Sequence, residues 1–128
     1  MNEKISYWIE VSDYDLETAE AMQMTKRFLY VGFMCHQVIE KILKALYTAT
    51  KKSTPPYTHN LISLAKDTGI FEQLSDDQKN FINLLRPLNV EARYPSYKEK
   101  LKQTLNEEKC RNILFHTKEL QQWIKQKL

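Results

Sequence analysis

The chain has 128 residues with a formal net charge of +3, and 42% of the residues are hydrophobic, which is enough apolar surface for one core and too little for two. Its two glycines, Gly32 and Gly69, cannot make a Gly-rich dinucleotide fingerprint or a Walker A loop, so the usual dehydrogenases and ATPases are excluded. The first residues do not resemble a signal peptide, and the longest apolar run, Phe28 to Cys35, is far shorter than the roughly 18 residues of a membrane span. We therefore expect a cytoplasmic protein with no membrane association.

Apolar residues recur at three- and four-residue intervals along most of the chain, which predicts an all-α protein. The first helix is expected from about Glu3 to Met24, with Asn2 as its N-cap. The second, from about Lys26 to Lys52, is the most hydrophobic segment, and its apolar residues cover about half of its circumference, as in a central helix. The other, polar half is expected to carry His36, Gln37, Glu40, Lys41 and Lys44.

The segment Ser53–Pro56 contains two prolines and requires a loop, because proline lacks the N–H that a helix uses. A short third helix follows, with Thr58 expected as its cap and Gly69 as its end. Ser75 and Gln78 then have the spacing of a capping box, which predicts the start of a fourth helix.

The fourth helix is expected to kink at Pro87 and to close at the irregular segment Arg93–Tyr97. The basic run after it, Lys98 to Lys102, is interpreted as a solvated loop or helix end. The last helix is expected from about Asn106 to the end of the chain. These elements predict one domain over residues 1–128, an up-and-down antiparallel bundle of four to five helices.

The segments Cys35–Leu46, Thr58–Leu61 and Glu91–Pro95, in this order and spacing, resemble the HEPN family of small prokaryotic helical-bundle proteins. The resemblance covers nearly the whole chain. It implies a bundle of four to five helices that dimerises, a proposed capacity to bind nucleotides, and a minimal nucleotidyltransferase encoded beside it. The leading hypothesis is a homodimeric nucleotide-binding or partner module that acts with a nucleotidyltransferase in a system of the toxin–antitoxin type.

The candidate nucleotide contacts are Lys41, Lys44, His59, Arg93 and Tyr94. Lys41 lies at the edge of the apolar half of its helix, where a charge needs a partner or an anionic ligand. His59 stands where it can cap the third helix or meet an anion at its N-terminus. Arg93 and Tyr94 offer a guanidinium for phosphate and a ring for base stacking, and they suit the closing of one bundle end equally well. Lys44 is also interpreted as half of an ordinary surface pair with Glu40.

The main alternative is a metal-independent endoribonuclease toxin. A second branch of the HEPN family cleaves RNA with an arginine followed, after four to six residues, by a histidine, and Arg111 and His116 fit that pattern. Arg111 would stabilise the phosphate and His116 would be the general acid or base. On one helix, however, positions five apart differ by about 140°, so the two side chains are expected on opposite flanks. A further alternative is a non-catalytic structural adaptor.

The remaining chemistry-bearing residues predict no metal site and no cofactor. Cys35 and Cys110 lack a CxxC spacing and are expected to be buried free thiols. The three histidines and two cysteines have no metal-ligand spacing. Phe115 and Trp123 are expected to be exposed on the far side of the last helix, where they suggest a partner surface or a homodimer.

Overall fold

The structure is a computed structural model that describes residues 2–89 and 95–128. In this part of the chain, the regular elements are six α-helices and two short 3₁₀ helices, with no strand, which confirms the all-α prediction. The elements in order are α1 (Glu3–Met24), α2 (Phe28–Lys51), α3 (Leu61–Thr68), η1 (Ile70–Gln73), α4 (Asp76–Leu85), η2 (Arg86–Leu88), α5 (Pro95–Thr104) and α6 (Glu107–Lys125).

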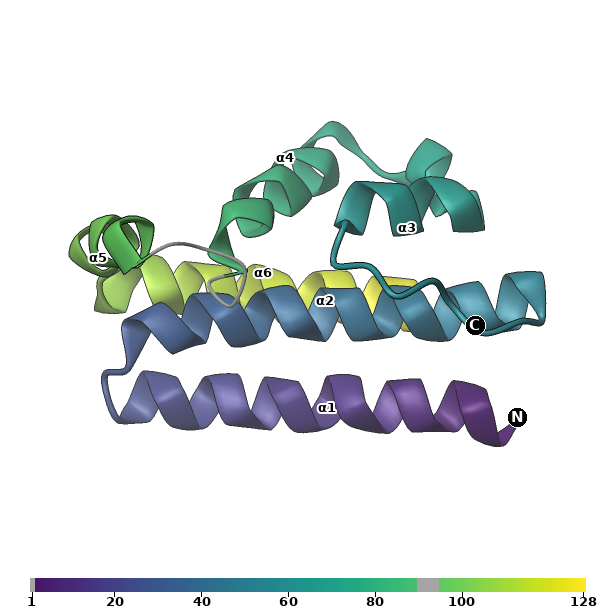
Figure 1. Ribbon diagram of the computed structural model, residues 1–128, viewed down its shortest axis with the longest axis horizontal. Helices are drawn as coiled ribbons and strands as arrows, with labels where there is room; N and C mark the ends of the chain where they lie inside the picture. Colours follow the sequence, from purple (N-terminus) through teal and green to yellow (C-terminus); the bar gives the residue numbers. More distant parts are fainter. Residues whose placement is uncertain (1, 90–94) are drawn as a thin grey trace.

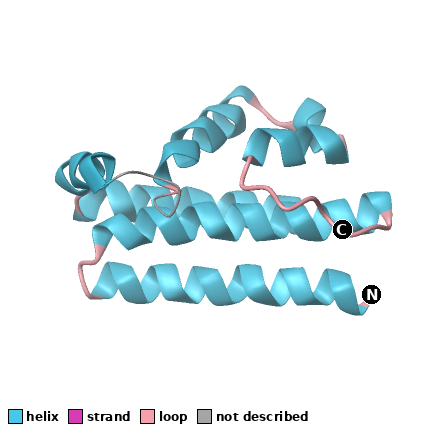
Figure 2. Cartoon of the chain, viewed as in Figure 1, coloured by secondary structure: helices cyan, strands magenta, loops and turns pink. Residues whose placement is uncertain are grey.

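The three long helices α1, α2 and α6 lie alongside one another (Figure 1). α2 runs antiparallel to α1, and the chain then returns through α3 and α4, which cover the side of α2 that faces away from α1. α6 runs back beside α2. The four legs alternate in direction, which confirms the up-and-down bundle, but the third leg is broken into short helices joined by loops (Figure 2).

α2 is the central helix and contacts all five of the other α-helices. Its apolar face supplies much of the core, as predicted. The polar residues of α2 were expected to form its exposed half. This prediction is wrong in part, because His36, Glu40 and Lys44 are buried. Side chains from α1 and from the loop between α2 and α3 cover this half of the helix, so its polar groups find partners inside the protein.

Most helix ends follow local side-chain chemistry. Asn2 Oδ1 accepts hydrogen bonds from the N–H groups of Lys4 and Ile5, which confirms it as the cap of α1. Ser75 and Gln78 form the predicted capping box at the start of α4. The prediction for α3 is wrong by two residues: Asn60, whose Oδ1 accepts from Ser63 N–H, is its cap instead of Thr58.

The region after α4 differs from the predicted single kinked helix. α4 ends at Leu85, and Pro87 lies in the 3₁₀ helix η2. The basic run from Lys98 to Lys102 is helical, as part of α5, where a loop or helix end was expected. Pro95 stands at the start of α5, where a missing N–H costs nothing because the first turn of a helix has no intrahelical acceptor for it.

Both glycines have a structural role. A Cβ on Gly32 would lie 3.2 Å from the Leu88 Cδ1 atom and 3.4 Å from that of Leu105, so a small residue lets these leucines approach α2. Gly69 ends α3 with φ of +82°, in the left-handed region that glycine adopts without strain. No helix in the described residues is long and apolar enough to cross a membrane.

Cys35 and Cys110 are buried free thiols, as predicted. Burial raises the pKa of the Cys35 thiol to about 12 and that of Cys110 to about 11. Both thiols therefore stay protonated at neutral pH and are poor nucleophiles, since the thiolate is the reactive form. Their part in this protein is core packing.

Candidate functional site

The carboxylate of Glu40, in the middle of α2, is the centre of a buried polar cluster. Its side chain is completely buried. His59 Nδ1 lies 2.8 Å from Glu40 Oε1, while the Nζ atoms of Lys44 and Lys41 lie 3.1 Å and 3.3 Å from Oε2. His36 Nδ1 is 3.9 Å from Oε1. We call these five residues the Glu40 cluster.

Helical spacing and one long loop bring the cluster together. His36, Glu40 and Lys44 are four residues apart and therefore share one face of α2. His59 comes from the loop that precedes α3. Trp8 of α1 packs against the cluster, because Lys44 Nζ lies 5.5 Å from the centre of its ring, within cation–π range. The cluster thus joins α1, α2 and the loop at one place.

The cluster holds Glu40 in its ionised form. Burial by itself raises the pKa of this carboxyl, but the hydrogen bond from His59 and the charges of Lys41 and Lys44 outweigh burial and lower the pKa below its ordinary value. Because an ionised carboxylate only accepts hydrogen bonds, His59 donates through Nδ1–H. Its Nε2 is then an acceptor in the neutral ring and a donor in the imidazolium.

The pKa values of two nearby groups are shifted so that the neutral form of each is favoured. Burial lowers the pKa of His36, and the nearby Glu40 charge offsets this only in part. Burial also raises the pKa of Asp15 in α1, while the charge of Lys41 pulls it down. The neutral form of His36 is therefore favoured inside the cluster, while Glu40 is ionised.

The basic groups of the cluster differ in their access to solvent. The Lys44 side chain is only 7% exposed, that of Lys41 is 18% exposed and that of His59 is 48% exposed. Since Nδ1 of His59 faces the buried Glu40, the exposed part of the ring is the part away from that nitrogen. His59 and Lys41 can thus meet a ligand, whereas Lys44 is enclosed and positions the carboxylate.

The structure brings together three of the five predicted nucleotide contacts, Lys41, Lys44 and His59. The other two, Arg93 and Tyr94, lie outside the described residues. The interpretation of Glu40 and Lys44 as a surface pair is wrong, because both are buried. Periodicity assigned them to the polar half of α2 and contains no information about which other segment covers that half. The partner that Lys41 was expected to need is Glu40.

The alternative ribonuclease pair lies elsewhere, on α6. Arg111 is exposed, with a guanidinium nitrogen 3.9 Å from Glu107 Oε2, and His116 is exposed, with Nδ1 3.2 Å from Glu119 Oε1. The two residues therefore have separate partners within one chain. Their joint role in RNA cleavage stays a prediction.

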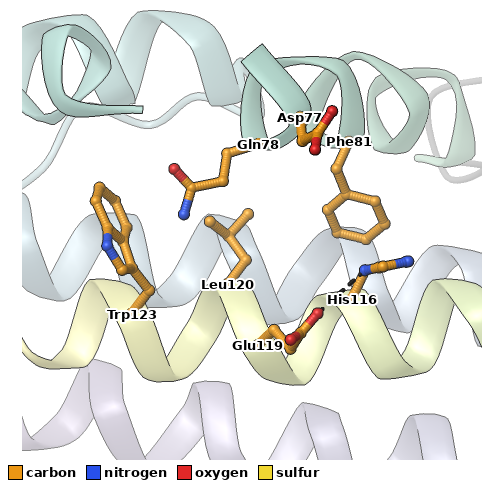
Figure 3. A pocket seen from close by; sticks show the side chains of 7 residues that line it. All are labelled: Asp77, Gln78, Phe81, His116, Glu119, Leu120 and Trp123. Atoms are coloured by element: carbon orange, nitrogen blue, oxygen red, sulfur yellow. Dashed lines mark hydrogen bonds and ion pairs between the residues drawn. The ribbon is translucent and has the colours of Figure 1, made fainter. Parts of the chain in front are cut away.

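His116 borders a cavity of about 340 Å³ between α4 and α6, which Figure 3 shows. We call it the α4–α6 cavity; its lining residues are Asp77, Gln78, Phe81, His116, Glu119, Leu120 and Trp123. Two of them are carboxylates, and among these lining residues there is no lysine or arginine. The cavity therefore offers a poor electrostatic environment for an RNA phosphate.

The aromatic residues of α6 were predicted to be exposed. Phe115 is exposed, as expected. Trp123 is partly buried against the core and forms one wall of the α4–α6 cavity. The His116 ring also contacts Phe81 of α4, at 5.7 Å between ring centres. Across the described residues, no group of three or more His, Cys, Asp or Glu side chains is placed to hold a metal ion.

The fold and the site define a small single-domain helical bundle with a buried, cation-paired carboxylate on its central helix. The family model described as HEPN domain matches residues 5–127, so the chain belongs to the HEPN domain family. The fold is similar to the crystal structure of TT1696 from Thermus thermophilus, with a TM-score of 0.82 and 16% sequence identity over 99% of this chain and 100% of that chain. A search of curated proteins found no match.

Proposed function

We propose that the protein is a nucleotide-binding or partner module of the HEPN family, a homodimer that acts with a nucleotidyltransferase in a system of the toxin–antitoxin type. The observation that carries the proposal is the Glu40 cluster. It holds three basic side chains within hydrogen-bond distance of one carboxylate, and two of the three, Lys41 and His59, reach solvent.

The charge balance of the cluster supports an anionic ligand. Glu40 contributes one negative charge against the two positive charges of Lys41 and Lys44. One further carboxyl, Asp15 in α1, interacts electrostatically with Lys41 and Glu40, and burial raises its pKa. Protonation of His59 adds a third positive charge at the exposed edge. A phosphate at this edge would meet the ammonium of Lys41 and the imidazolium of His59.

The arrangement of the candidate residues supports a binding role better than it supports RNA cleavage. The Glu40 cluster is preorganised by hydrogen bonds to a buried carboxylate, while Arg111 and His116 are exposed and paired with different glutamates. A purely structural adaptor would use the cluster only to hold the loop to α2. The two roles differ in whether a phosphate compound binds.

The direct test is a titration with ATP, GTP and inorganic tripolyphosphate, followed by the melting temperature and by calorimetry. We expect millimolar ATP or GTP to raise the melting temperature of the wild type, since a ligand that binds only the folded state stabilises it. Lys41→Ala and Arg93→Ala should each reduce this shift. The control is Lys118→Ala, which removes a lysine paired with the exposed Glu20 on the protein surface.

The proposal is wrong if no nucleotide raises the melting temperature of the wild type. If the nucleotide raises the melting temperature of Lys41→Ala and Arg93→Ala as much as that of the control, these residues do not form the binding site. The oligomeric part is tested by light scattering of the purified chain, with a dimer expected. Co-purification with a nucleotidyltransferase encoded by a neighbouring gene tests the partner.

A further inference from the structure

An apolar slot lies next to the Glu40 cluster, where the loop between α2 and α3 passes the N-terminal part of α1. Its volume is about 270 Å³. The lining residues come from α1, the end of α2 and the loop: Glu3, Lys4, Tyr7, Trp8, Thr48, Thr54 and Pro55. Trp8 belongs to both places, because it lines the slot and its ring also lies under the Lys44 ammonium. We call this cavity the Trp8 slot.

The shape of the Trp8 slot suits one flat ring system. Tyr7 and Trp8 stand edge to face, with ring centres 5.2 Å apart and an angle of 72°, and Pro55 adds a wall from the loop. Tyr7 is 57% exposed, so its ring is accessible to a ligand in the slot. Sites for drug-sized ligands measure about 300–1,000 Å³. The smaller slot therefore has room for a single heterocycle and not for a whole larger ligand.

The slot and the basic edge of the Glu40 cluster lie on one line along α2. Thr48 lines the slot and Lys41 lies seven residues earlier, which is two helical turns and therefore nearly the same face. At about 1.5 Å per residue, the two positions are about 10 Å apart along the helix axis. Lys44 lies between them. The loop follows the same line, with Pro55 at the slot and His59 at the cluster.

We propose that the Trp8 slot binds the base of a nucleotide whose phosphates bind Lys41 and His59. This inference rests on the proposed function and adds its second half, the apolar surface on which the base stacks. Tyr7, Trp8 and Pro55 supply flat apolar surfaces, and stacking on aromatic side chains tolerates any of the common bases. The base would thus lie in the Trp8 slot near Thr48, and the phosphates would lie two helical turns away along α2, at Lys41 and His59.

The experiment uses probes that contain only one end of the ligand. Adenosine has the base without phosphate, tripolyphosphate has phosphate without the base, and ATP has both. The chain has two tryptophans, so Trp123→Phe leaves Trp8 as the single tryptophan, which is excited at a wavelength that tyrosine hardly absorbs. We expect ATP and adenosine to quench Trp8 fluorescence and tripolyphosphate to leave it unchanged.

Two variants then separate the ends. Tyr7→Ala should weaken ATP and adenosine about tenfold, as expected for a lost stacking contact, and leave tripolyphosphate unchanged. Lys41→Ala should weaken ATP and tripolyphosphate but not adenosine. The matched control is Tyr14→Ala, which removes an exposed tyrosine from the same helix. Circular dichroism of each variant checks that the helices are intact.

The outcomes distinguish this inference from the proposed function. Suppose that ATP binds in a Lys41-dependent manner without quenching Trp8 fluorescence and with the same affinity for the wild type and for Tyr7→Ala. In that result the base lies elsewhere, so the inference is overturned while the proposed function stands. If Tyr14→Ala weakens adenosine as much as Tyr7→Ala does, the slot is not the site. If the wild type binds none of the three probes, both proposals fall.

Discussion

Two histidine–glutamate pairs in this protein have the same chemistry in opposite surroundings. His59 and Glu40 lie 2.8 Å apart, and His116 and Glu119 lie 3.2 Å apart. Glu40 is buried and has two lysines beside it, whereas Glu119 is exposed on α6 and borders a cavity that also contains Asp77. The two histidines are about equally exposed, but only Glu119 has its carboxylate in water, so the pair at Glu40 is screened less and should have the larger effect on stability.

The comparison also shows that the two candidate sites differ in charge. The Glu40 cluster has an excess of positive charge and a basic edge open to solvent. The α4–α6 cavity has an excess of negative charge around its histidine. Residue spacing along the chain had made Arg111 and His116 a recognisable motif, yet the environment at the Glu40 cluster suits an anionic ligand better.

The largest effect is expected from Glu40→Gln. This change leaves the buried Lys44 without its counter-charge and should cost about 3–5 kcal/mol of unfolding free energy, measured by urea denaturation. Glu119→Gln is the matched control on the exposed pair and should change stability by less than about 0.5 kcal/mol. Equal losses in the two variants would show that burial does not distinguish the pairs.

A smaller difference is expected between the two histidines. His59→Ala removes a hydrogen bond to an ionised carboxylate, worth about 1 kcal/mol after allowance for its half-exposed ring. It should also speed amide hydrogen exchange in residues 53–60, because the loop loses its attachment to α2. His116→Ala should do neither. Unchanged exchange in the His59→Ala loop would mean that other contacts hold it.

The pH dependence of stability should come from the buried cluster. His36 has a pKa below its ordinary value of 6.5 in the folded state, so the unfolded chain binds more protons below about pH 6.5 and the unfolding free energy falls as the pH falls. His36→Gln should flatten this slope in urea titrations. Glu40 has a lowered pKa as well, so its contribution is lost at still lower pH, below about 4.5. Asp15, with a raised pKa, opposes this second trend.

No effect at all is expected in an RNA-cleavage assay. Purified wild type, Arg111→Ala and His116→Ala are incubated with several RNAs in the presence of EDTA, and the products are separated on a gel. Because the two side chains have separate partners on α6, we expect no cleavage by any of the three. Cleavage by the wild type that both substitutions abolish would instead establish the ribonuclease alternative.

Local features of the structure could be predicted from the sequence because their causes are local. The cap at Asn2, the capping box at Ser75 and the left-handed end at Gly69 each depend on residues within one helical turn. The HEPN resemblance, drawn from short segments, is confirmed by the family match. The helix after Pro95 was missed because its residues are mostly polar and have little apolar periodicity to detect.

The sequence by itself determined the helical class, the order of the helices other than α5, and most of their ends. The tertiary structure decided which polar residues are buried. Periodicity assigned Glu40 and Lys44 to the surface, and only the packing of Trp8 and the return of His59 along the loop enclose them. That enclosure depends on contacts between residues far apart in the chain, and it is what turns a common helical pair into a buried cluster with a basic edge.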